Sequence, residues 1–300
     1  MIQIVLHTTA ITVVAVAAYY GLRHLPDTRC DFLHYELNAV TDAGVEFCET
    51  GPAGFLDMER LRYPLVLELT AASRLQIGQA VPMTLRVLQS GGTPLLPHEL
   101  AVTHTRRLHL LVVDSSLGDY QHIHPEPLGA NGEWSWMFTP RKAGQYRVYA
   151  EMVPVRTRRK VVAVGTIDVP GVAEVPRIDE RLRAVANGYI FDLELGPSPF
   201  EVWHDFRMTL KVRSMTPGRQ VVMQPVMGAY AHMVAFDAEG RGFAHMHPVS
   251  TDTQLDRMQP QVGFTFHTGR TGLYRFWAQV RLDDREVFVP FDLQVRDSAF

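Results

Sequence analysis

Most of the chain alternates apolar and polar residues with a period of two. The pattern is clearest in residues 65–69, 83–87, 190–195 and 274–280, which are separated by turn-forming residues. A segment of this kind buries one face and leaves the other polar, which is typical of an antiparallel β-strand. Only the N-terminal segment has an extended helical pattern. The pattern therefore predicts an all-β body behind one N-terminal helix.

The all-β body contains the same domain twice. Residues 108–125 align with residues 231–248 without a gap, and the match extends upstream to Met83 and Met208 and downstream through Tyr146 and Tyr274. Six or seven short strands in each copy indicate a β-sandwich. We therefore predict two tandem immunoglobulin-like β-sandwich domains. In that fold the tyrosine of each Gly-x-Tyr pair hydrogen-bonds back to a nearby corner.

The repeat divides the chain into five parts. Residues 61–170 are predicted to form the first β-sandwich and residues 188–300 the second, with residues 171–187 as the linker. Residues 26–60 form an N-terminal extension that contains both cysteines. If this part is exported, Cys30 and Cys48 are expected to form a disulfide, and the alternative is two independent thiols.

The N-terminal helix, within residues 1–25, is predicted to be a membrane anchor or a signal segment. Residues 2–22 contain no acidic residue, lysine or arginine, and about 20 such residues span a bilayer core. Arg23 and Arg29 follow the segment and favour a cytoplasmic body, whereas the β-rich domains suit an exported protein. We expect a single N-terminal anchor, retained or cleaved, with the body on the periplasmic side.

Composition and charge narrow the function. The 300 residues suffice for two domains with cores, and 46% of them are hydrophobic. A formal net charge of −3 excludes the broad basic surface of a nucleic-acid-binding protein. The short basic stretch at residues 156–160 is expected to be a solvated hairpin end.

Each repeat carries three histidines at the same spacing. They are His109, His122 and His124 in the first copy, and His232, His245 and His247 in the second. If residues 115–118 form the turn of a hairpin, residue 114 pairs with 119 and residue 109 lies opposite 124. The same reasoning, with residues 238–241 as the turn, places residue 232 opposite 247. The period of two then puts the three imidazoles of each copy on one face.

Three imidazoles on one rigid face would make a transition-metal site. A fourth ligand is expected five residues upstream, where the first copy has His104 and the second has Met227. An exchange of histidine for methionine favours copper, because Cu(I) accepts a thioether, and zinc is the alternative. Three further methionines add sulfur nearby: Met223, Met233 and Met246. The histidines outside the pattern, His98, His204 and His267, are expected to be ordinary surface or core residues.

The motif resembles one in a family of bacterial proteins. His104-Thr-Arg-Arg-Leu-His109, followed by His122-Ile-His124-Pro, and the second copy's Ala-His245-Met-His247-Pro, are similar to repeated motifs in largely uncharacterised exported proteins. These proteins are associated with copper or heavy-metal handling. The resemblance covers most of residues 60–297 and implies an exported β-sandwich with a histidine metal site.

Three functions follow as hypotheses. The first is a membrane-tethered periplasmic copper-binding protein for storage, delivery or tolerance, which passes the ion to a partner protein. The second is a two-domain scaffold or adhesion module in which duplicated histidines only stabilise the hairpins, since fold alone does not specify function. The third is a redox enzyme, for which the sequence offers no separate acid–base pair or nucleophile. We therefore expect a binding protein rather than an enzyme.

Overall fold

The computed structural model describes most of the chain: residues 2–23, 37–41, 44–48, 53–177, 179–198, 200–249 and 255–297. The chain separates into two compact units, residues 1–36 and residues 37–300. The first contains the predicted helix, α1 (Ile2–Arg23). Within the described residues, no helix has both the length and the apolar character that crossing a bilayer requires. The helix is therefore confirmed, and its role as a membrane anchor stays a prediction.

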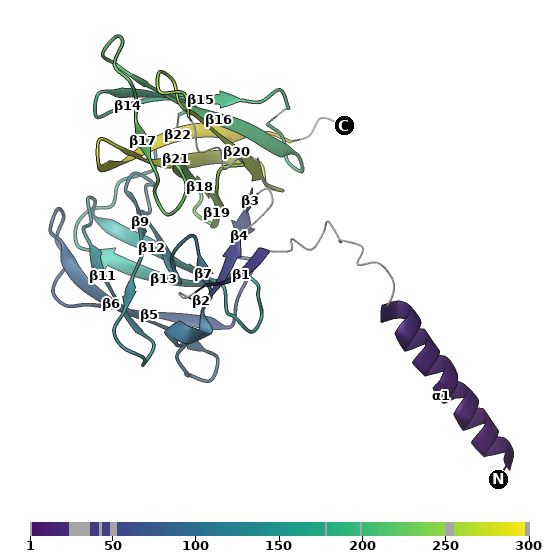
Figure 1. Cartoon of the computed structure of the whole chain (residues 1–300). Helices are drawn as coiled ribbons and strands as arrows, with labels where there is room; N and C mark the ends of the chain where they lie inside the picture. Colours follow the sequence, from purple (N-terminus) through teal and green to yellow (C-terminus); the bar gives the residue numbers. More distant parts are fainter. Residues whose placement is uncertain are drawn as a thin grey trace. The chain divides into compact units, whose positions relative to one another are not determined.

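The first repeat consists of two antiparallel sheets on a common core (Figure 1). Apolar side chains that alternate along each strand, among them Leu85, Trp134 and Val148, fill the space between the sheets. One sheet has the order β10-β11-β6-β5 and the other β13-β12-β8-β9. Their bounds are β5 (Leu65–Ala71), β6 (Val81–Gln89), β8 (His109–Asp114), β9 (Tyr120–Ile123), β10 (Glu126–Pro127), β11 (Glu133–Phe138), β12 (Gly144–Met152) and β13 (Val161–Val169). A short 3₁₀ turn, η1 (Pro97–Glu99), precedes β8.

The second repeat is built in the same way. Its sheets have the orders β14-β15-β16-β20 and β17-β21-β18-β19, with β22 paired to β21. Their bounds are β14 (Arg183–Ala186), β15 (Tyr189–Leu195), β16 (Asp205–Ser214), β17 (Met223–Gln224), β18 (Ala231–Asp237), β19 (Gly242–Met246), β20 (Gln261–His267), β21 (Gly272–Leu282) and β22 (Arg285–Val295). The duplicated two-sheet architecture is therefore confirmed. The predicted linker is shorter than expected, because residues 183–186 form a paired strand.

The predicted N-terminal extension does not remain separate from the repeats. Strands β1 (Leu37–Thr41) and β2 (Gly44–Cys48) form a small sheet with β7 (Val102–Thr103) of the first repeat. Strands β3 (Ala53–Gly54) and β4 (Leu56–Asp57) instead extend the sheets of the second repeat. Strand β3 pairs with β20 in one sheet, and β4 pairs with β19 in the other. At Gly242, an added Cβ would lie 1.9 Å from the Leu56 carbonyl oxygen, so this close pairing requires glycine. Cys30 lies outside the described residues, and the disulfide with Cys48 stays a prediction.

The two repeats pack against each other through a third apolar cluster. Leu111, Val113 and Tyr120 of the first repeat meet Phe236 and Phe243 of the second. Hydrogen bonds cross the same junction, and one of them joins the Trp277 indole to the Leu117 carbonyl oxygen at 3.2 Å. Strands β8 and β18 are therefore buried on both faces. One face of each strand packs against the core of its own repeat, and the other face packs against the opposite repeat.

The two predicted tyrosine corners are present. The Tyr146 hydroxyl accepts a hydrogen bond from the Lys142 amide at 3.0 Å, and the Tyr274 hydroxyl donates to the Arg270 carbonyl at 3.0 Å. The Tyr146 hydroxyl also donates to the buried carboxylate of Asp119 at 2.7 Å. The two corners therefore differ in one respect, which is that only the first includes a charged acceptor.

This difference predicts unequal costs for the same substitution. Tyr146→Phe removes a donor from a buried carboxylate and should cost about 2 kcal/mol, since hydrogen bonds to charged groups contribute about 1.5 to 3 kcal/mol. Tyr274→Phe removes neutral hydrogen bonds and should cost about 1 kcal/mol. Urea unfolding of the two variants measures both values. Equal losses in the free energy of unfolding would show that the Asp119 carboxylate gains no stabilisation from the Tyr146 hydrogen bond.

Candidate metal centre

The first three-histidine set lies on the hairpin β8–β9. The strands pair Leu110 with Ile123 and Val113 with Tyr120, and the same register places His109 opposite His124. The Asp114 amide donates to the Asp119 carbonyl oxygen at 3.1 Å and closes the turn over residues 115–118. The predicted register is therefore confirmed.

The Asp114 carboxylate stabilises this turn from inside. It accepts hydrogen bonds from the amides of Gly118 and Asp119, each at 2.7 Å. In the second repeat the Asp237 carboxylate stabilises the turn in the same way, because it accepts hydrogen bonds from the amides of Arg241 at 2.6 Å and Gly242 at 3.1 Å. A buried carboxylate that binds successive amides holds the turn in one conformation. It thereby holds the histidine register of each hairpin.

The second three-histidine set lies on the hairpin β18–β19. Met233 pairs with Met246 and Phe236 with Phe243, so His232 lies opposite His247 as predicted. In both hairpins the histidines occupy the face that also carries the junction between the repeats. The sequence left open whether the two sets are separate or face each other, and the structure brings them together.

The imidazoles of both repeats form one group, which we call the histidine cluster: His104, His109, His122, His124, His232, His245 and His247. Across the junction, the ring centroids of His122 and His245 are 5.0 Å apart. The rings of His104 and His247 stack with centroids 3.7 Å apart. Within the second set, the centroids are separated by 4.6 to 6.0 Å. Seven of the eight predicted ligands therefore meet at one place.

The nitrogen atoms of the first set converge. One ligand atom from each of His109, His122 and His124 lies within 4.8 Å of the others. His109 Nδ1 is 3.4 Å from His122 Nε2 and 3.2 Å from His124 Nε2. These three atoms point at a common volume, as the ligands of a metal ion do.

The surrounding acceptors fix which nitrogen of each ring carries a proton. His109 Nε2 lies 2.9 Å from the Thr103 carbonyl oxygen, which can only accept a proton. His122 Nδ1 lies 2.9 Å from the Gln279 side-chain oxygen, and the Gln279 amide nitrogen is oriented by Glu286 at 2.8 Å. The lone pairs are therefore left on His109 Nδ1 and His122 Nε2, which are the converging atoms. Metal-binding histidines are commonly oriented in this way.

The second set is buried without such partners. Five of its ring nitrogens are buried and have no hydrogen-bond partner among the residues that the structure describes: both nitrogens of His232, both of His245, and Nε2 of His247. A buried polar atom without a partner costs about 1 to 3 kcal/mol. The fold therefore maintains an unfavourable arrangement that a metal ion would relieve.

Burial keeps the histidines of the cluster neutral. It lowers the pKa of His109 to about 4 and that of His122 to about 3, because the charged imidazolium loses its hydration. The pKa values of His124, His232, His245 and His247 are lowered for the same reason and by the neighbouring imidazoles. A neutral imidazole keeps its lone pair, so a cation at neutral pH need not displace protons.

Two residues of the centre were missed from the sequence, Glu151 and Gln279. Glu151 pairs with His109 in the register of β12 and β8, and Gln279 pairs with His232 in that of β21 and β18. The buried carboxylate of Glu151 lies 3.5 Å from His245 Nδ1 and 3.0 Å from Lys160 Nζ. The available signal was the repeat itself, which places a polar residue at the same position after Ala150 and Ala278. Lys160 also departs from the predicted solvated hairpin end, because it turns toward Glu151.

The predicted sulfur ligands are placed differently. Met223, Met233 and Met246 lie in the core of the second repeat, so the sulfur expected from them near the histidines is wrong. Met233 and Met246 pair with each other on the face opposite the histidines. Met227 occupies the tight turn of the second repeat that is equivalent to the turn of His104 in the first, with φ of 51° against 48°. His104 stacks on His247, and Met227 as a ligand stays a prediction.

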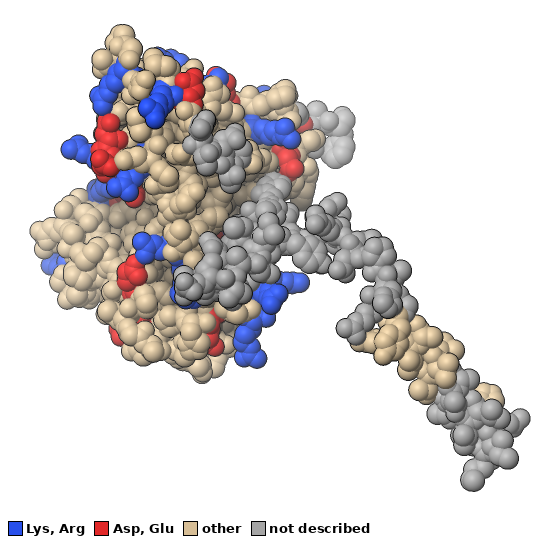
Figure 2. Space-filling view, in the orientation of Figure 1, with Lys and Arg blue, Asp and Glu red and all other residues tan. Residues whose placement is uncertain are grey.

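The remaining histidines and charges do not form a competing centre in the described part of the chain. His98 and His204 are exposed, and His267 pairs with Asp205 at 2.9 Å. Their assignment as ordinary residues agrees with these positions. On the face shown in Figure 2, basic and acidic side chains are interspersed rather than gathered into a field of one sign.

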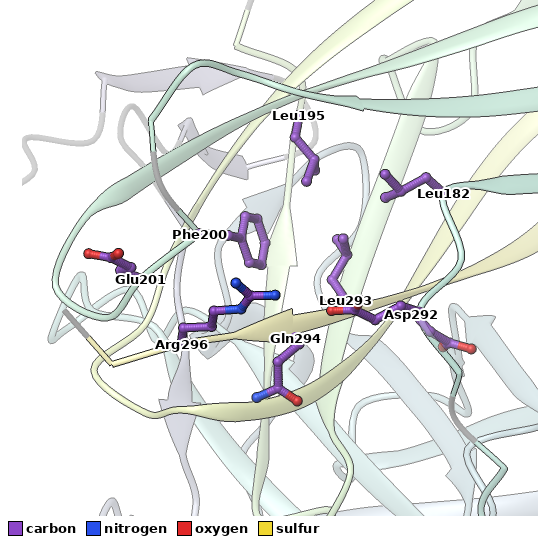
Figure 3. A pocket seen from close by; sticks show the side chains of 9 residues that line it. Leu182, Leu195, Phe200, Glu201, Asp292, Leu293, Gln294 and Arg296 are labelled. Atoms are coloured by element: carbon purple, nitrogen blue, oxygen red, sulfur yellow. The ribbon is translucent and has the colours of Figure 1, made fainter. Parts of the chain in front are cut away.

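A surface pocket of 630 Å³ lies in the second repeat, and none of the predicted ligands lines it (Figure 3). Its lining is apolar at Leu182, Phe200 and Leu293, and Asp292 and Arg296 supply charge. The Asp292 carboxylate is already bound by the Arg275 guanidinium through two contacts of 2.7 Å. The pocket therefore has no free anionic group at that point, and it contains none of the histidines.

The unpartnered nitrogens predict that one histidine opposes stability. His232→Leu replaces two buried, unsatisfied atoms with an apolar side chain and should stabilise the metal-free protein by about 1 to 3 kcal/mol. His122→Leu should destabilise it by a similar amount, because it leaves Gln279 without its partner. Urea unfolding of the two variants gives both signs. A loss of stability in both would show that the His232 nitrogens are satisfied in solution.

Comparisons with known proteins identify a family without a known function. A family model described as a domain of unknown function (DUF8832) matches residues 65–169 and 184–297. No curated protein matches. The solved structures that are similar include a Corynebacterium diphtheriae protein described as membrane anchored, at 10% identity and a TM-score of 0.24, covering 78% of this chain and 59% of that one.

Two structures of Escherichia coli alpha-2-macroglobulin are also similar. The elastase-activated form has 12% identity, a TM-score of 0.24 and coverage of 79% of this chain and 22% of that one. The trypsin-activated form has 13% identity, a TM-score of 0.26 and coverage of 78% and 18%. This chain therefore spans about three fifths of the first structure and about a fifth of the macroglobulins.

Proposed function

This chain belongs to the family described as a domain of unknown function (DUF8832), of which it carries two copies, and we propose that it binds a transition-metal ion through the histidine cluster. The observation that carries the proposal is the convergence of His109, His122 and His124, whose ligand atoms lie within 4.8 Å of one another. The proton positions imposed by Thr103 and Gln279 support it, because they leave lone pairs on converging atoms.

Copper is the ion that we propose, with zinc as the alternative. Neutral imidazoles suit both ions, and three of them with one position open is a common arrangement. Met223, Met233 and Met246 lie in the core and do not supply the thioether ligands that the sequence led us to expect. The proposal of copper therefore rests on the imidazole ligands and on the resemblance of the motif to proteins of copper handling.

The access to the cluster suits storage or delivery of the ion. His109, His122, His232 and His245 are buried, whereas His104, His124 and His247 are partly exposed. The partly exposed rings give an ion, or a partner protein that receives it, a route to the buried ligands. We propose an exported protein tethered to the membrane by its N-terminal segment, in which the site loads and releases copper on the periplasmic side.

The test is metal retention by the full-length chain. The purified protein is exposed to copper, desalted, and assayed for metal per chain. We expect the wild type to retain copper and the variant His109→Ala/His122→Ala to retain less. The matched control is His98→Ala/His204→Ala, which removes two histidines outside the cluster and should retain as much copper as the wild type. A ratio near zero for the wild type would refute the proposal.

A second candidate is a two-domain immunoglobulin-like scaffold with structural histidines. It is favoured by the hydrogen bonds that His109 and His122 make to Thr103 and Gln279, which hold the two rings in place without an ion. In that case the histidine variants would lower stability equally with and without metal, and metal would not stabilise the wild type. The same retention and unfolding measurements distinguish the two functions.

A further inference from the structure

The histidine cluster has an approximate internal symmetry that matches the sequence repeat. In the first repeat His122 is held by Gln279 of the second repeat at 2.9 Å. In the second repeat the equivalent His245 lies 3.5 Å from Glu151 of the first repeat. Glu151 and Gln279 are themselves equivalent, since each pairs with the first histidine of its own repeat. Each repeat thus supplies three imidazoles and one acceptor that crosses to the other repeat.

The second set has the same residues at the same register positions as the first, while among the described residues the first set alone brings three ligand atoms within 4.8 Å of one another. Glu151 lies 3.5 Å from His245 Nδ1, at the position equivalent to that of Gln279 beside His122, and it forms no hydrogen bond with that nitrogen. His232 and His247 add three buried nitrogens that have no hydrogen-bond partner within the described part of the chain. In the first set, His109 and His122 already have hydrogen-bond acceptors, Thr103 and Gln279, on the nitrogens that face away from the other rings. One ion on the first set would leave the second set unsatisfied.

His104 belongs with the second set, although it lies in the first repeat. Its ring stacks on His247 with centroids 3.7 Å apart and lies 6.3 Å from that of His232. Its ring centroid lies 6.5 Å from that of His109 of its own repeat. A ligand supplied across the junction would complete the second set. It would also account for the methionine at position 227, where the second repeat no longer needs a histidine of its own.

We propose that the cluster binds two metal ions at once, in adjacent sites on either side of the junction. This inference rests on the proposed function and extends it from one ion to a pair. His109, His122 and His124 hold the first ion. His232, His245 and His247 hold the second, with His104 as an additional ligand. The two sites are adjacent, because the ring centroids of His122 in the first and His245 in the second are 5.0 Å apart.

Charge determines which ions can occupy both sites. At equal separation, repulsion between two divalent ions is about four times that between two monovalent ions, since it scales with the product of the charges. The buried carboxylate of Glu151 supplies one negative charge beside His245, and the Lys160 ammonium group offsets part of it. The centre therefore suits a pair of Cu(I) ions better than a pair of Zn(II) or Cu(II) ions.

The first test is the number of Cu(I) ions per chain. The full-length protein is titrated anaerobically with Cu(I) in competition with a coloured Cu(I) chelator. We expect two ions for the wild type, one for His124→Ala and one for His247→Ala. These two variants are matched, because they change equivalent and partly exposed residues that are less critical to folding. The control His98→Ala/His204→Ala should bind two, and circular dichroism checks the fold of every variant.

The possible outcomes separate the two proposals. One ion in the wild type would overturn the pair and leave the proposed function intact. No ion in the wild type would overturn both. Two ions in the wild type and in both variants would place the second ion outside the cluster and would overturn the pair.

The second test is whether the sites are adjacent. Oxidation of the two-copper protein with ferricyanide gives two Cu(II) ions, whose unpaired electrons couple when the ions are close. We expect the wild type to show a broadened and weakened electron paramagnetic resonance signal, and each one-copper variant a normal signal. A wild-type signal equal to the sum of the two variants would show distant, independent sites and would contradict the inference.

Discussion

Copper in excess should raise the melting temperature of the wild-type protein by about 10 °C. An ion that binds only the folded state stabilises it by about 4 kcal/mol when its free concentration is about 1,000 times the dissociation constant. In a protein of this size, each kcal/mol shifts the melting temperature by about 2 to 4 °C. The histidines of each set lie on one face only in the paired register of their hairpin, so the unfolded chain does not hold them together. Circular dichroism melting with and without copper measures the shift.

The control for this shift is the loss of the ligands. His109→Ala/His122→Ala removes two of the three converging nitrogens of the first set and should reduce the copper-induced shift, because only the second set is then left to hold an ion. A chelator added to the copper-loaded wild type should restore the melting temperature of the metal-free protein. A shift of equal size in the variant would show that copper stabilises the protein elsewhere.

The hairpin register could be predicted from the sequence because two independent constraints agree. A period of two fixes which residues share a face, and a four-residue turn fixes which residues lie opposite each other. His109 and His124 are opposite for that reason, as are His232 and His247. The second repeat has the same turn length and the same histidine spacing, so the same pairing of residues is expected there. A slip of one residue would have placed the histidines of either copy on the other face.

The period of two along a strand could also have excluded the methionines as ligands. Met233 follows His232 by one residue and Met246 precedes His247 by one, so both must point to the opposite face of the hairpin. That face lines the core of the second repeat. Distance along the sequence suggested that their sulfur was near the histidines, whereas the geometry of a strand separates them. Nearness in sequence is a poor guide to nearness of side chains in a sheet.

The junction between the repeats could not be derived from the alternating pattern. Periodicity reports which residues are buried and does not report what covers them. The signal that was present is that residues 109–114 and 231–237 are almost continuously apolar, as strands covered on both faces are. These are the strands that bear the histidines, so recognising them as doubly covered would have brought the two sets together. Strands β3, β4 and β14 were missed because two to four residues are too few to show a period.

Acid should destabilise the metal-free protein steeply. His109 and His122 have pKa values of about 4 and about 3 in the folded state, below their ordinary value of 6.5. Above pH 6.5 the histidines are neutral in both states, and stability is fully present. Below pH 6.5 the unfolded chain takes up protons that the folded cluster excludes, so stability falls as the pH falls toward 4 and 3. At pH 5 each of the two histidines costs about 2 kcal/mol.

The loss from these two residues is about 4 kcal/mol at pH 5, a large part of the stability of an ordinary domain. The pKa values of four other cluster histidines are lowered as well, and they act in the same direction. Urea unfolding of the metal-free protein at pH 7.5, 6 and 5 measures the fall. The variant His109→Asn/His122→Asn lacks two of the titrating groups and should lose less between pH 7.5 and 5. An identical pH dependence in the variant and the wild type would show that these histidines take up protons without unfolding.

Copper should delay this acid unfolding. A coordinated imidazole has no lone pair to offer a proton, so protons must displace the ion before the ring can become charged. The copper-loaded protein should therefore retain its pH 7.5 stability to a lower pH than the metal-free protein and then lose metal and stability together. Release of copper without loss of stability would instead mean that the folded cluster opens to admit protons while the two repeats remain packed through Tyr120, Phe236 and Phe243.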